Sequence, residues 1–341
     1  MTVGAPTRTR PDPLLRLGLL VAAVATVAAA LGIGVRALYG AHVAVDEEQY
    51  VLSATSLIED GDLDITDEMV EERWRAFADV PPAVETQPRA DGSNISPHDP
   101  LLPLLLAVPT GIGGWVGAKL ALSLAAGAVA ALTLWLAVRR FGVRPRTAAV
   151  GAAVAGASAP LAVYGQQIYP ELPAALVVLV GVAALTGPVR DRELWLLGAV
   201  VTALPWLSIK YGLVAATLAA LGALRWWRAG RRGRVGLLAA GLTLMAVVNL
   251  AVHRVVWGGW TAYASGDHFA ETGEFAVVGV DPDHAERTLR IAGLLLDREF
   301  GLVPWQPAWL LAVPAVAALL TRRRPGWAVL AAPLAAGWFV A

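Results

Sequence analysis

The sequence predicts an all-α fold, a bundle of membrane-spanning helices, and three observations support this prediction. Hydrophobic residues make up 57% of the 341 residues and charged residues only 16%, with a mean hydropathy of +0.58. Several apolar runs approach or exceed the ~20 residues that cross a bilayer as a helix. Arg-rich breaks separate many of these runs. A soluble domain of this length could not bury so much apolar surface.

The apolar runs predict nine spans in a single domain that covers residues 1–341. The expected spans are about 17–39, 115–138, 147–164, 168–187, 194–209, 211–224, 235–256 and 308–321, with a ninth that begins near Trp327. The first run is too long for the core of a signal peptide, so we expect it to remain as a helix. The last run is short and lacks a polar flank, so we expect a C-terminal truncation at Ala341.

The distribution of charge predicts the orientation of the helices. Net charge is zero, with 27 Lys and Arg against 27 Asp and Glu. With a cytoplasmic N-terminus, every short inside segment is basic, as the positive-inside rule requires. The basic residues of these segments are Arg8, Arg10, Arg16, Arg139, Arg140, Arg144, Arg146, Arg190, Arg192, Arg225, Arg228, Arg231, Arg232, Arg234, Arg322, Arg323 and Arg324. Most acids lie between Asp46 and Asp99, which we therefore expect outside the cytoplasm.

Composition also limits the chemistry. The chain has no Cys, so disulfides, thiolate catalysis and Cys-bound metals are excluded. It contains no GxGxxG, Walker loop or zinc spacing, which disfavours a nucleotide-powered pump. Basic residues that are nearly all Arg, with abundant Ala and Gly, are typical of a high-GC bacterium. We expect a multi-pass protein of a bacterial plasma membrane, with the lipid bilayer and no nucleic acid as partners.

Two long segments are expected on the extracytoplasmic side. The first, residues 40–114, should carry two helices on the membrane surface, about 47–60 and 67–78, with Thr66 as the cap of the second. The apolar face of the second helix would be Met69, Val70, Trp74 and Phe77. The segment "LLPLLLAVPTGIGG" follows as a dipping or interfacial piece broken by prolines. The second long segment, residues 257–307, contains Trp, Gly and Pro residues at intervals, which is typical of a structured loop at a membrane boundary.

Candidate functional groups gather on this expected outer side. Asp46, Glu47 and Glu48 follow the first span directly, and Glu171 is the single charge of a short turn. Lys210 lies in a turn between two short spans, so we expect it to be partly sunk into the protein. A reaction at the outer surface has no ATP or nucleotide-sugar available, so a lipid-linked activated donor is the natural substrate.

Five motifs in order resemble the GT-C superfamily of polyprenyl-phosphate-sugar-dependent glycosyltransferases. They are "DEEQYVLSATSLIEDGDLDI", "SPHDPLLPLLLAVP", "YGQQIYPELPAAL", "LPWLSIKYG" and "LLLDREFGLVPWQPAWLLA". This superfamily includes protein O-mannosyltransferases and aminoarabinose transferases, and the chain is most similar to its bacterial RgtA/B/C/D-like branch. The motifs cover nearly the whole chain but do not specify a substrate.

The resemblance implies transfer of a hexosyl or pentosyl group from a polyprenyl-phosphate donor to an envelope glycan, lipid or protein, in cell wall biogenesis. It implies that Asp46 is the general base and that Glu47 positions acceptor or sugar, although either acid of the pair could be the base. Lys210 would neutralise the lipid phosphate. The further substrate-binding candidates are Glu171, His98, Tyr211 and Arg298. No ligand spacing identifies a metal site, and a need for a divalent metal stays open.

Simpler interpretations remain beside these. Lys119 can be a snorkelling lysine, His98 and Glu171 can be local caps, and the acids from Glu59 to Asp64 can be plainly solvated. A transporter or flippase of lipid-linked sugars is the first alternative function, although it predicts repeats and polar groups near the midplane. A non-catalytic envelope scaffold is the second, and it predicts that Asp46, Glu47 and Lys210 tolerate substitution together.

Overall fold

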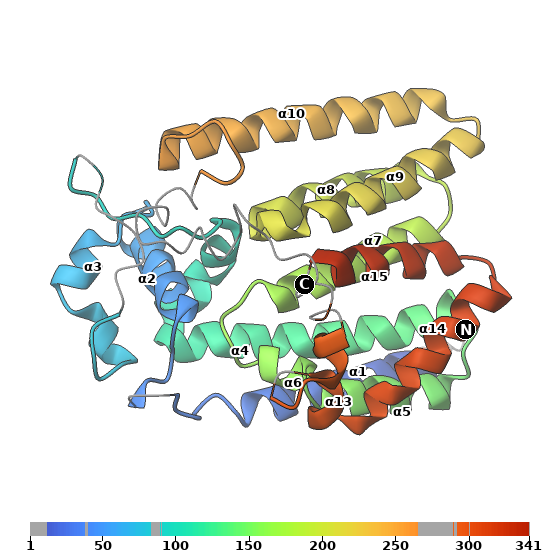
Figure 1. The fold of residues 1–341 in the computed structure, drawn as a ribbon, viewed down its shortest axis with the longest axis horizontal. Coiled ribbons are helices and arrows are strands. Elements are labelled where there is room, and N and C mark those ends of the chain that lie inside the picture. Colours follow the sequence, from blue (N-terminus) through green and yellow to red (C-terminus); the bar gives the residue numbers. More distant parts are fainter. Residues whose placement is uncertain are drawn as a thin grey trace, which may run out of the picture.

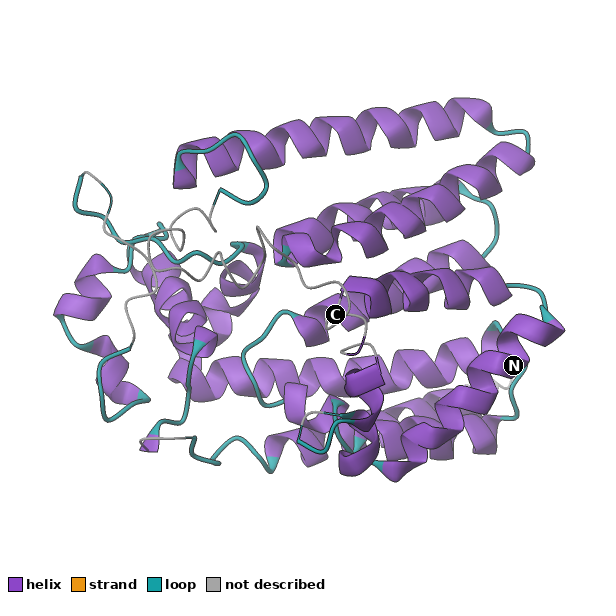
Figure 2. Ribbon diagram, viewed as in Figure 1, coloured by secondary structure: helices purple, strands orange, loops and turns teal. Residues whose placement is uncertain are grey.

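The computed structural model describes residues 12–37, 40–82, 89, 91–264, 289, 292–299 and 301–340. Within these ranges the chain forms helices and no strand, and a single isolated antiparallel bridge pairs Asp64 with Ile95. The predicted all-α fold is therefore confirmed. Long helices lie side by side and run back and forth, while α2 and α3 gather at one end of them (Figures 1 and 2).

The long helices make a bundle whose apolar character suits a membrane. They are α1 (Pro13–Ala30), α4 (Leu101–Arg139), α5 (Pro145–Gly156), α7 (Glu171–Thr186), α8 (Asp191–Leu207), α9 (Gly212–Arg228), α10 (Arg232–Trp257), α14 (Ala312–Arg322) and α15 (Trp327–Val340). Three of the described helices, α1, α4 and α10, are long and apolar enough to cross a bilayer. The described residues thus contain three candidate membrane spans, and the nine predicted spans remain a prediction.

Small residues let α1, α4 and α5 pack closely. A Cβ atom added at Gly156 would lie 2.8 Å from the Cβ of Ala25 and 3.1 Å from that of Ala130. Close contact between backbones replaces the hydrophobic driving force that is missing between helices in lipid. This explains why the seam between these helices is made of Ala and Gly.

The Arg-rich segments meet at the end of the bundle opposite α2 and α3 (Figure 1). Arg139 pairs with Asp12 at 2.8 Å, and Arg234 pairs with Asp191. Arg225 donates hydrogen bonds to the final carbonyls of α7, which are otherwise unpaired at a helix end. Loops predicted to share the cytoplasmic side therefore lie together, which is the arrangement that the positive-inside rule requires.

The first span is shorter than predicted. We expected residues 17–39, whereas α1 covers Pro13–Ala30. Its start is fixed by Asp12, whose carboxylate accepts a hydrogen bond from the Leu14 backbone amide at 3.0 Å. Its end precedes a turn that contains Gly32 and Gly34, residues of low helix propensity.

The third predicted span, residues 147–164, is interrupted. The chain forms α5 as far as Gly156 and then the short α6 (Leu161–Tyr164), with a break at 157–160. Pro160 has no backbone amide hydrogen, so it cannot continue the hydrogen bonds of the helix.

The segment "LLPLLLAVPTGIGG" is helical rather than broken by its prolines. It forms the first part of α4, and the break falls at Gly113 and Gly114 instead. Gly114 has a φ of 59° and a ψ of −151°, which glycine adopts readily and other residues do not. After the kink, Gly117 comes so close to Pro109 that an added Cβ would lie 2.1 Å from the Pro109 carbonyl oxygen. These glycines, and not the prolines, set the kink.

Both predicted helices of the first loop exist, with a shorter second one. α2 covers Asp46–Glu59, and α3 (Thr66–Val70) is followed by the 3-10 helix η2 (Arg73–Ala76). The expected Thr66 cap is wrong, because Thr66 is the first helical residue and its hydroxyl donates to the Asp64 carboxylate at 2.5 Å. The same Asp64 oxygen accepts from the Thr66 amide at 3.1 Å, the local turn that Asp favours.

The predicted apolar face of the second helix is partly wrong. Trp74 and Phe77 are buried as expected, but Val70 is 76% exposed. The end of α3 at Val70 and the left-handed φ of 58° at Glu72 rotate the chain, so a single helical face does not extend through these residues.

The second long loop is described only in part. Residues 265–288, 290, 291 and 300 lie outside the described ranges. The described remainder includes α13 (Leu302–Trp305) and the 3-10 helix η5 (Pro307–Leu311), which lead into α14. The prediction that 257–307 is one structured loop therefore stays a prediction.

Candidate active site at the first-loop end of the bundle

The first turn of α2 brings the acidic motif to a strained backbone position. Val45 precedes the helix with a φ of 57° and a ψ of −136°, values that a β-branched residue rarely adopts. Asp46, Glu47 and Glu48 form the first turn, where the helix dipole favours negative charge. Strain of this kind costs about 1–3 kcal/mol and is concentrated at functional sites. The strained conformation of Val45 therefore makes the next residue, the half-buried Asp46, a candidate functional residue.

Glu47 is buried and held on both of its oxygens. Oε1 accepts from the Ile168 amide at 2.7 Å and lies 3.8 Å from Lys119 Nζ, while Oε2 accepts from the Ala44 amide at 3.2 Å. Burial raises the pKa of Glu47, and the Lys119 ammonium and the two amides oppose this shift. Glu47 thus joins the first loop, α4 and the turn before α7.

Lys119 was expected to be a snorkelling lysine, and this was wrong. It is 4% exposed, and its ammonium donates to the His42 carbonyl at 2.6 Å in addition to facing Glu47. The helix turns it inward because Lys119 follows the kink in α4 and lies on the face that packs against the first loop.

Tyr50 is buried at the centre of a group of polar side chains that we call the polar cluster. Its neighbours in this cluster are Asp46, His98, Asp99, Glu171 and Tyr211. Tyr50 lies one helical turn after Asp46 on α2, and its ring stacks on His98 with centroids 4.6 Å apart. Its pKa is raised well above 10, first by burial and then by the nearby charges of Asp46, Glu171 and Asp99. Carboxylates from three distant segments therefore lie within electrostatic range of one phenol.

Glu171 and Lys210 meet at the mouth of this cluster. Glu171 begins α7, and Lys210 lies in the 3-10 helix η3 (Ile209–Tyr211), with 2.5 Å between Lys210 Nζ and Glu171 Oε1. The Lys210 ammonium is 5.3 Å from the ring centroid of Tyr211.

Lys210 is more open to solvent than its expected partly sunken position suggests. Its side chain is 47% exposed, against 28% for Glu171. The turn at η3 carries the lysine past the end of α8, so the ammonium reaches the surface beside Glu171. A cation at this position is accessible to a ligand that arrives from outside the bundle.

Asp99 and His253 extend the cluster to α10, and the sequence reasoning missed both. Asp99 Oδ2 accepts from the Ile209 amide at 3.1 Å, and Oδ1 lies 3.5 Å from His253 Nε2. His253 Nδ1 is 2.9 Å from the Asn249 carbonyl oxygen, which can only accept, so Nδ1 carries a hydrogen. A lone His on an apolar helix and an Asp directly after His98 were the only available signals.

The remaining candidate, Arg298, is not joined to this cluster. It is exposed in the turn after residues 292–296. Among the described residues, no hydrogen bond or ion pair connects Arg298 with Glu171, Lys210 or Tyr211.

An apolar groove of two cavities lies near the cluster. A cavity of about 690 Å³ lies between α8 and α10, with Trp195, Trp206 and Met245 in its wall. A second cavity of about 330 Å³ shares Trp206 and Met245 and reaches Ile209 and Gly212, on either side of Lys210. The two cavities therefore adjoin each other, and the second lies beside the turn that carries Lys210.

The residues best arranged to hold a metal lie apart from this cluster. Within the described part of the chain, Asp60, Asp67 and Glu68 are the group whose ligand atoms lie close enough to share an ion. Glu47, Glu171 and Asp99 are instead engaged with Lys119, Lys210 and His253, and Glu47 and Asp99 also with backbone amides.

Comparison of this chain with protein-family models, curated proteins and solved structures finds no match.

Proposed function

We propose that this protein is an integral membrane glycosyltransferase of the GT-C type, with about nine spans and its active site on the extracytoplasmic side. It transfers a hexosyl or pentosyl group from a polyprenyl-phosphate donor to an envelope glycan, lipid or protein. One observation carries this proposal. Two adjoining apolar cavities on α8 and α10 lie next to the turn that holds Lys210, which pairs with Glu171 of the polar cluster. A lipid-linked sugar phosphate likewise has an apolar chain, then a phosphate, then a polar sugar.

The groove supports a binding mode for the donor. The prenyl chain lies against Trp195, Trp206 and Met245, which bury apolar surface. The phosphate reaches Lys210, whose exposed ammonium exchanges its pairing with Glu171 for the phosphate oxygens. An exposed ion pair is worth only about 0–1 kcal/mol, so this exchange has a low cost. His98 and Tyr211 contribute hydrogen bonds to the sugar or phosphate.

Asp46 acts as the general base in this proposal. The acceptor hydroxyl gives its proton to the Asp46 carboxylate while its oxygen attacks the anomeric carbon. The bond between that carbon and the phosphate oxygen breaks, and the lipid phosphate leaves with the electron pair. Lys210 stabilises the negative charge that develops on the phosphate. Attack opposite to the leaving phosphate inverts the anomeric centre.

Glu47 is assigned a positioning role. Its two oxygens accept backbone amides and face Lys119, which leaves it poorly suited to take a proton from an acceptor. By fixing the start of α2 against α4, Glu47 holds Asp46 in place. The sequence favoured Asp46 as the base but kept Glu47 as an alternative, and these contacts of Glu47 support the assignment to Asp46.

The proposal is tested with the purified full chain in liposomes. The protein is incubated with a panel of polyprenyl-phosphate sugars and an envelope extract as the source of acceptors, and release of lipid phosphate is followed. We expect release from at least one donor, and loss of about 10²–10⁴-fold in rate for Asp46→Asn. Glu71→Gln is the matched control, because it removes an exposed carboxylate of the same loop.

Two outcomes would overturn the proposal. Wild-type protein that releases no lipid phosphate from any donor is not a glycosyltransferase of this class. Movement of the intact lipid-linked sugar across the liposome membrane without release would identify a flippase instead.

A further inference from the structure

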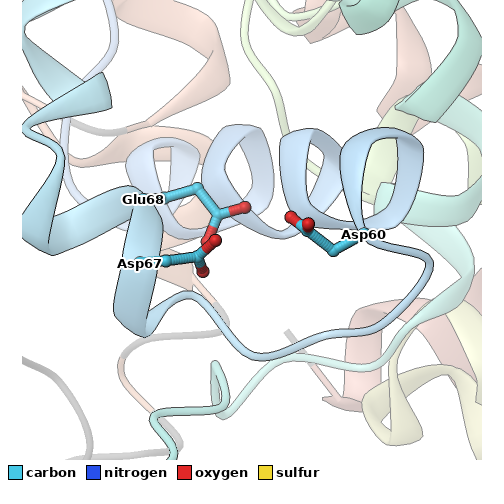
Figure 3. A group of neighbouring side chains, drawn as sticks. All are labelled: Asp60, Asp67 and Glu68. Atoms are coloured by element: carbon cyan, nitrogen blue, oxygen red, sulfur yellow. The ribbon is translucent and has the colours of Figure 1, made fainter.

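Three carboxylates lie together at the far end of α2 from the polar cluster. Asp60 follows the last residue of α2, while Asp67 and Glu68 belong to α3. One ligand oxygen from each residue lies within 4.8 Å of the others. Figure 3 shows the side chains of Glu68 and Asp67 turned toward each other, with Asp60 reaching toward them from the end of α2.

Glu68 differs from an ordinary solvent-exposed acid, because its carboxyl group is buried. It is 2% exposed, and among the described residues neither of its carboxylate oxygens accepts a hydrogen bond from a protein donor; its polar neighbour is the carboxyl group of Asp67. A buried polar group without a partner costs about 1–3 kcal/mol, and more when it is charged. The side chains that face the buried Glu68 carboxyl group are those of two further acids, Asp60 and Asp67, both of which are exposed.

The nearest cation is already engaged. Arg73 lies within electrostatic range of Glu68, but its guanidinium pairs with Glu59 at 2.8 Å and with Glu71 at 2.9 Å. Among the described residues, no Lys, Arg or His forms an ion pair with Asp60, Asp67 or Glu68. The group therefore has three acids and no protein cation of its own.

We propose that Asp60, Asp67 and Glu68 form a calcium site that ties the end of α2 to α3. Calcium prefers carboxylate and water oxygens at about 2.3–2.6 Å, so two oxygens on one ion lie up to about 5 Å apart. The separations of the three ligand oxygens, all within 4.8 Å, are compatible with a shared calcium ion. Magnesium usually keeps several of its water ligands and is bound through one or two carboxylates, so a group of three carboxylates favours calcium.

The site has a structural consequence for the first loop. Calcium would close the segment between Asp60 and Asp67, where Ser56 Oγ already donates to the carbonyls of Asp62 and Asp64. α2 carries Asp46 at its other end, so fixing this helix also fixes the orientation of the acidic motif. Water molecules complete the coordination, because two of the three carboxylates are open to solvent.

The test measures calcium binding directly and does not depend on enzyme activity. The purified full chain is stripped with a chelator and titrated with CaCl₂ by calorimetry, with thermal unfolding as a second readout. We expect one ion per chain with a Kd on the order of 10⁻⁴–10⁻³ M, the range of weak extracellular sites. We also expect Tm to rise by a few degrees at saturation.

Variants with a matched control locate the site. Asp60→Asn and Glu68→Gln should each weaken calcium binding at least tenfold, whereas the adjacent Glu59→Gln should bind within about twofold of wild type. Asp60 is exposed, so its variant keeps the test valid if Glu68→Gln fails to fold. The proposal is overturned if wild-type protein shows no saturable binding up to about 10 mM calcium, well above that range. It is also overturned if Asp60→Asn binds like Glu59→Gln, or if magnesium binds more tightly than calcium.

Discussion

Glu47 and Glu171 each pair with a lysine, yet their surroundings give the two pairs different roles. The Glu47–Lys119 pair is 8% and 5% exposed, while the Glu171–Lys210 pair is 28% and 47% exposed. A buried pair resists rearrangement, because each charge depends on the other for the solvation that water no longer supplies. An exposed pair can exchange partners at little cost. We therefore assign structure to the first pair and ligand exchange to the second.

Removing one member of the buried pair should destabilise the protein strongly. Glu47→Gln leaves the Lys119 ammonium buried and without its counter-charge, and we expect a loss of about 3–5 kcal/mol. Lys210→Met should cost no more than about 1 kcal/mol, because the pair it breaks is exposed. Thermal unfolding in detergent compares the two variants. Equal Tm values for Glu47→Gln and Lys210→Met would contradict this difference.

Glu68 should make stability depend on pH when calcium is removed. Burial, and then the neighbouring Asp67 and Asp60, raise the pKa of Glu68 from 4.5 to about 8. The folded protein therefore keeps a proton that the unfolded chain releases between these values. The stability from neutral Glu68 is complete below about pH 4.5 and is lost as pH rises through about 8.

This effect is measured as the change in Tm between pH 6 and pH 8.5 in the presence of a chelator. Wild-type Tm should fall with rising pH more than that of Glu68→Gln, which has no proton to lose. The difference between the two proteins isolates Glu68 from other titrating groups, including the nearby Arg73, Asp60 and Asp67. The same pH dependence in both would show that Glu68 is not the source.

At the level of single residues, the sequence predicted several members of the polar cluster but not the buried Tyr50 and His253. Glu171 and Lys210 stand out as charges in apolar turns, and Asp46 stands out through the motif that resembles the GT-C superfamily; both signals are visible in the sequence. Tyr50 and His253 carry no such signal, because their environment arises from contacts between segments far apart in the chain. Lys119 was misjudged for the same reason, since its partner Glu47 lies on another element.

At the level of elements, apolar runs predicted where helices exist better than where they end. α10 and α15 match their predicted spans within a few residues. α1 differs, because its start depends on Asp12 as a cap. In α4, the part after the glycine kink matches the predicted span 115–138, but the helix already begins at Leu101. Prolines attracted attention in "LLPLLLAVPTGIGG", but Pro103 lies in the first turn of α4, where the amide hydrogen that proline lacks would have no partner.

The kink in α4 gives a matched pair of variants. Gly114 has a φ of 59°, whereas the adjacent Gly113 has a φ of −137° and open space around it. Gly114→Ala should destabilise by about 1–3 kcal/mol, while Gly113→Ala should be close to neutral. Denaturation of both variants in the same detergent measures this. A tolerated Gly114→Ala with an unfolded Gly113→Ala would contradict the described kink.

At the level of the whole molecule, charge separates the two ends of the bundle. Arg139, Arg225 and Arg234 bind partners at one end, while α2, α3 and the polar cluster occupy the other (Figure 1). The sequence predicted this separation from the basic loops alone, because short loops must return the chain to alternating sides. The assignment of one end to the cytoplasm remains a prediction.

Labelling of single cysteines tests this orientation in intact cells. The chain has no native Cys, so Ala229→Cys and Val70→Cys each carry a single thiol. An impermeant thiol reagent should label Val70→Cys and should not label Ala229→Cys until the cells are opened. Labelling of Ala229→Cys from outside would reverse the topology and remove the argument for an extracytoplasmic reaction.

Transfer chemistry at Asp46 is the central claim, and single-turnover release of lipid phosphate tests it most directly. Wild-type protein and Asp46→Asn are mixed in liposomes with the active donor, a saturating acceptor and equal amounts of folded protein. The account predicts that Asp46→Asn binds the donor with unchanged affinity and releases phosphate about 10²–10⁴-fold more slowly than wild type. Release by Asp46→Asn at the wild-type rate would contradict it.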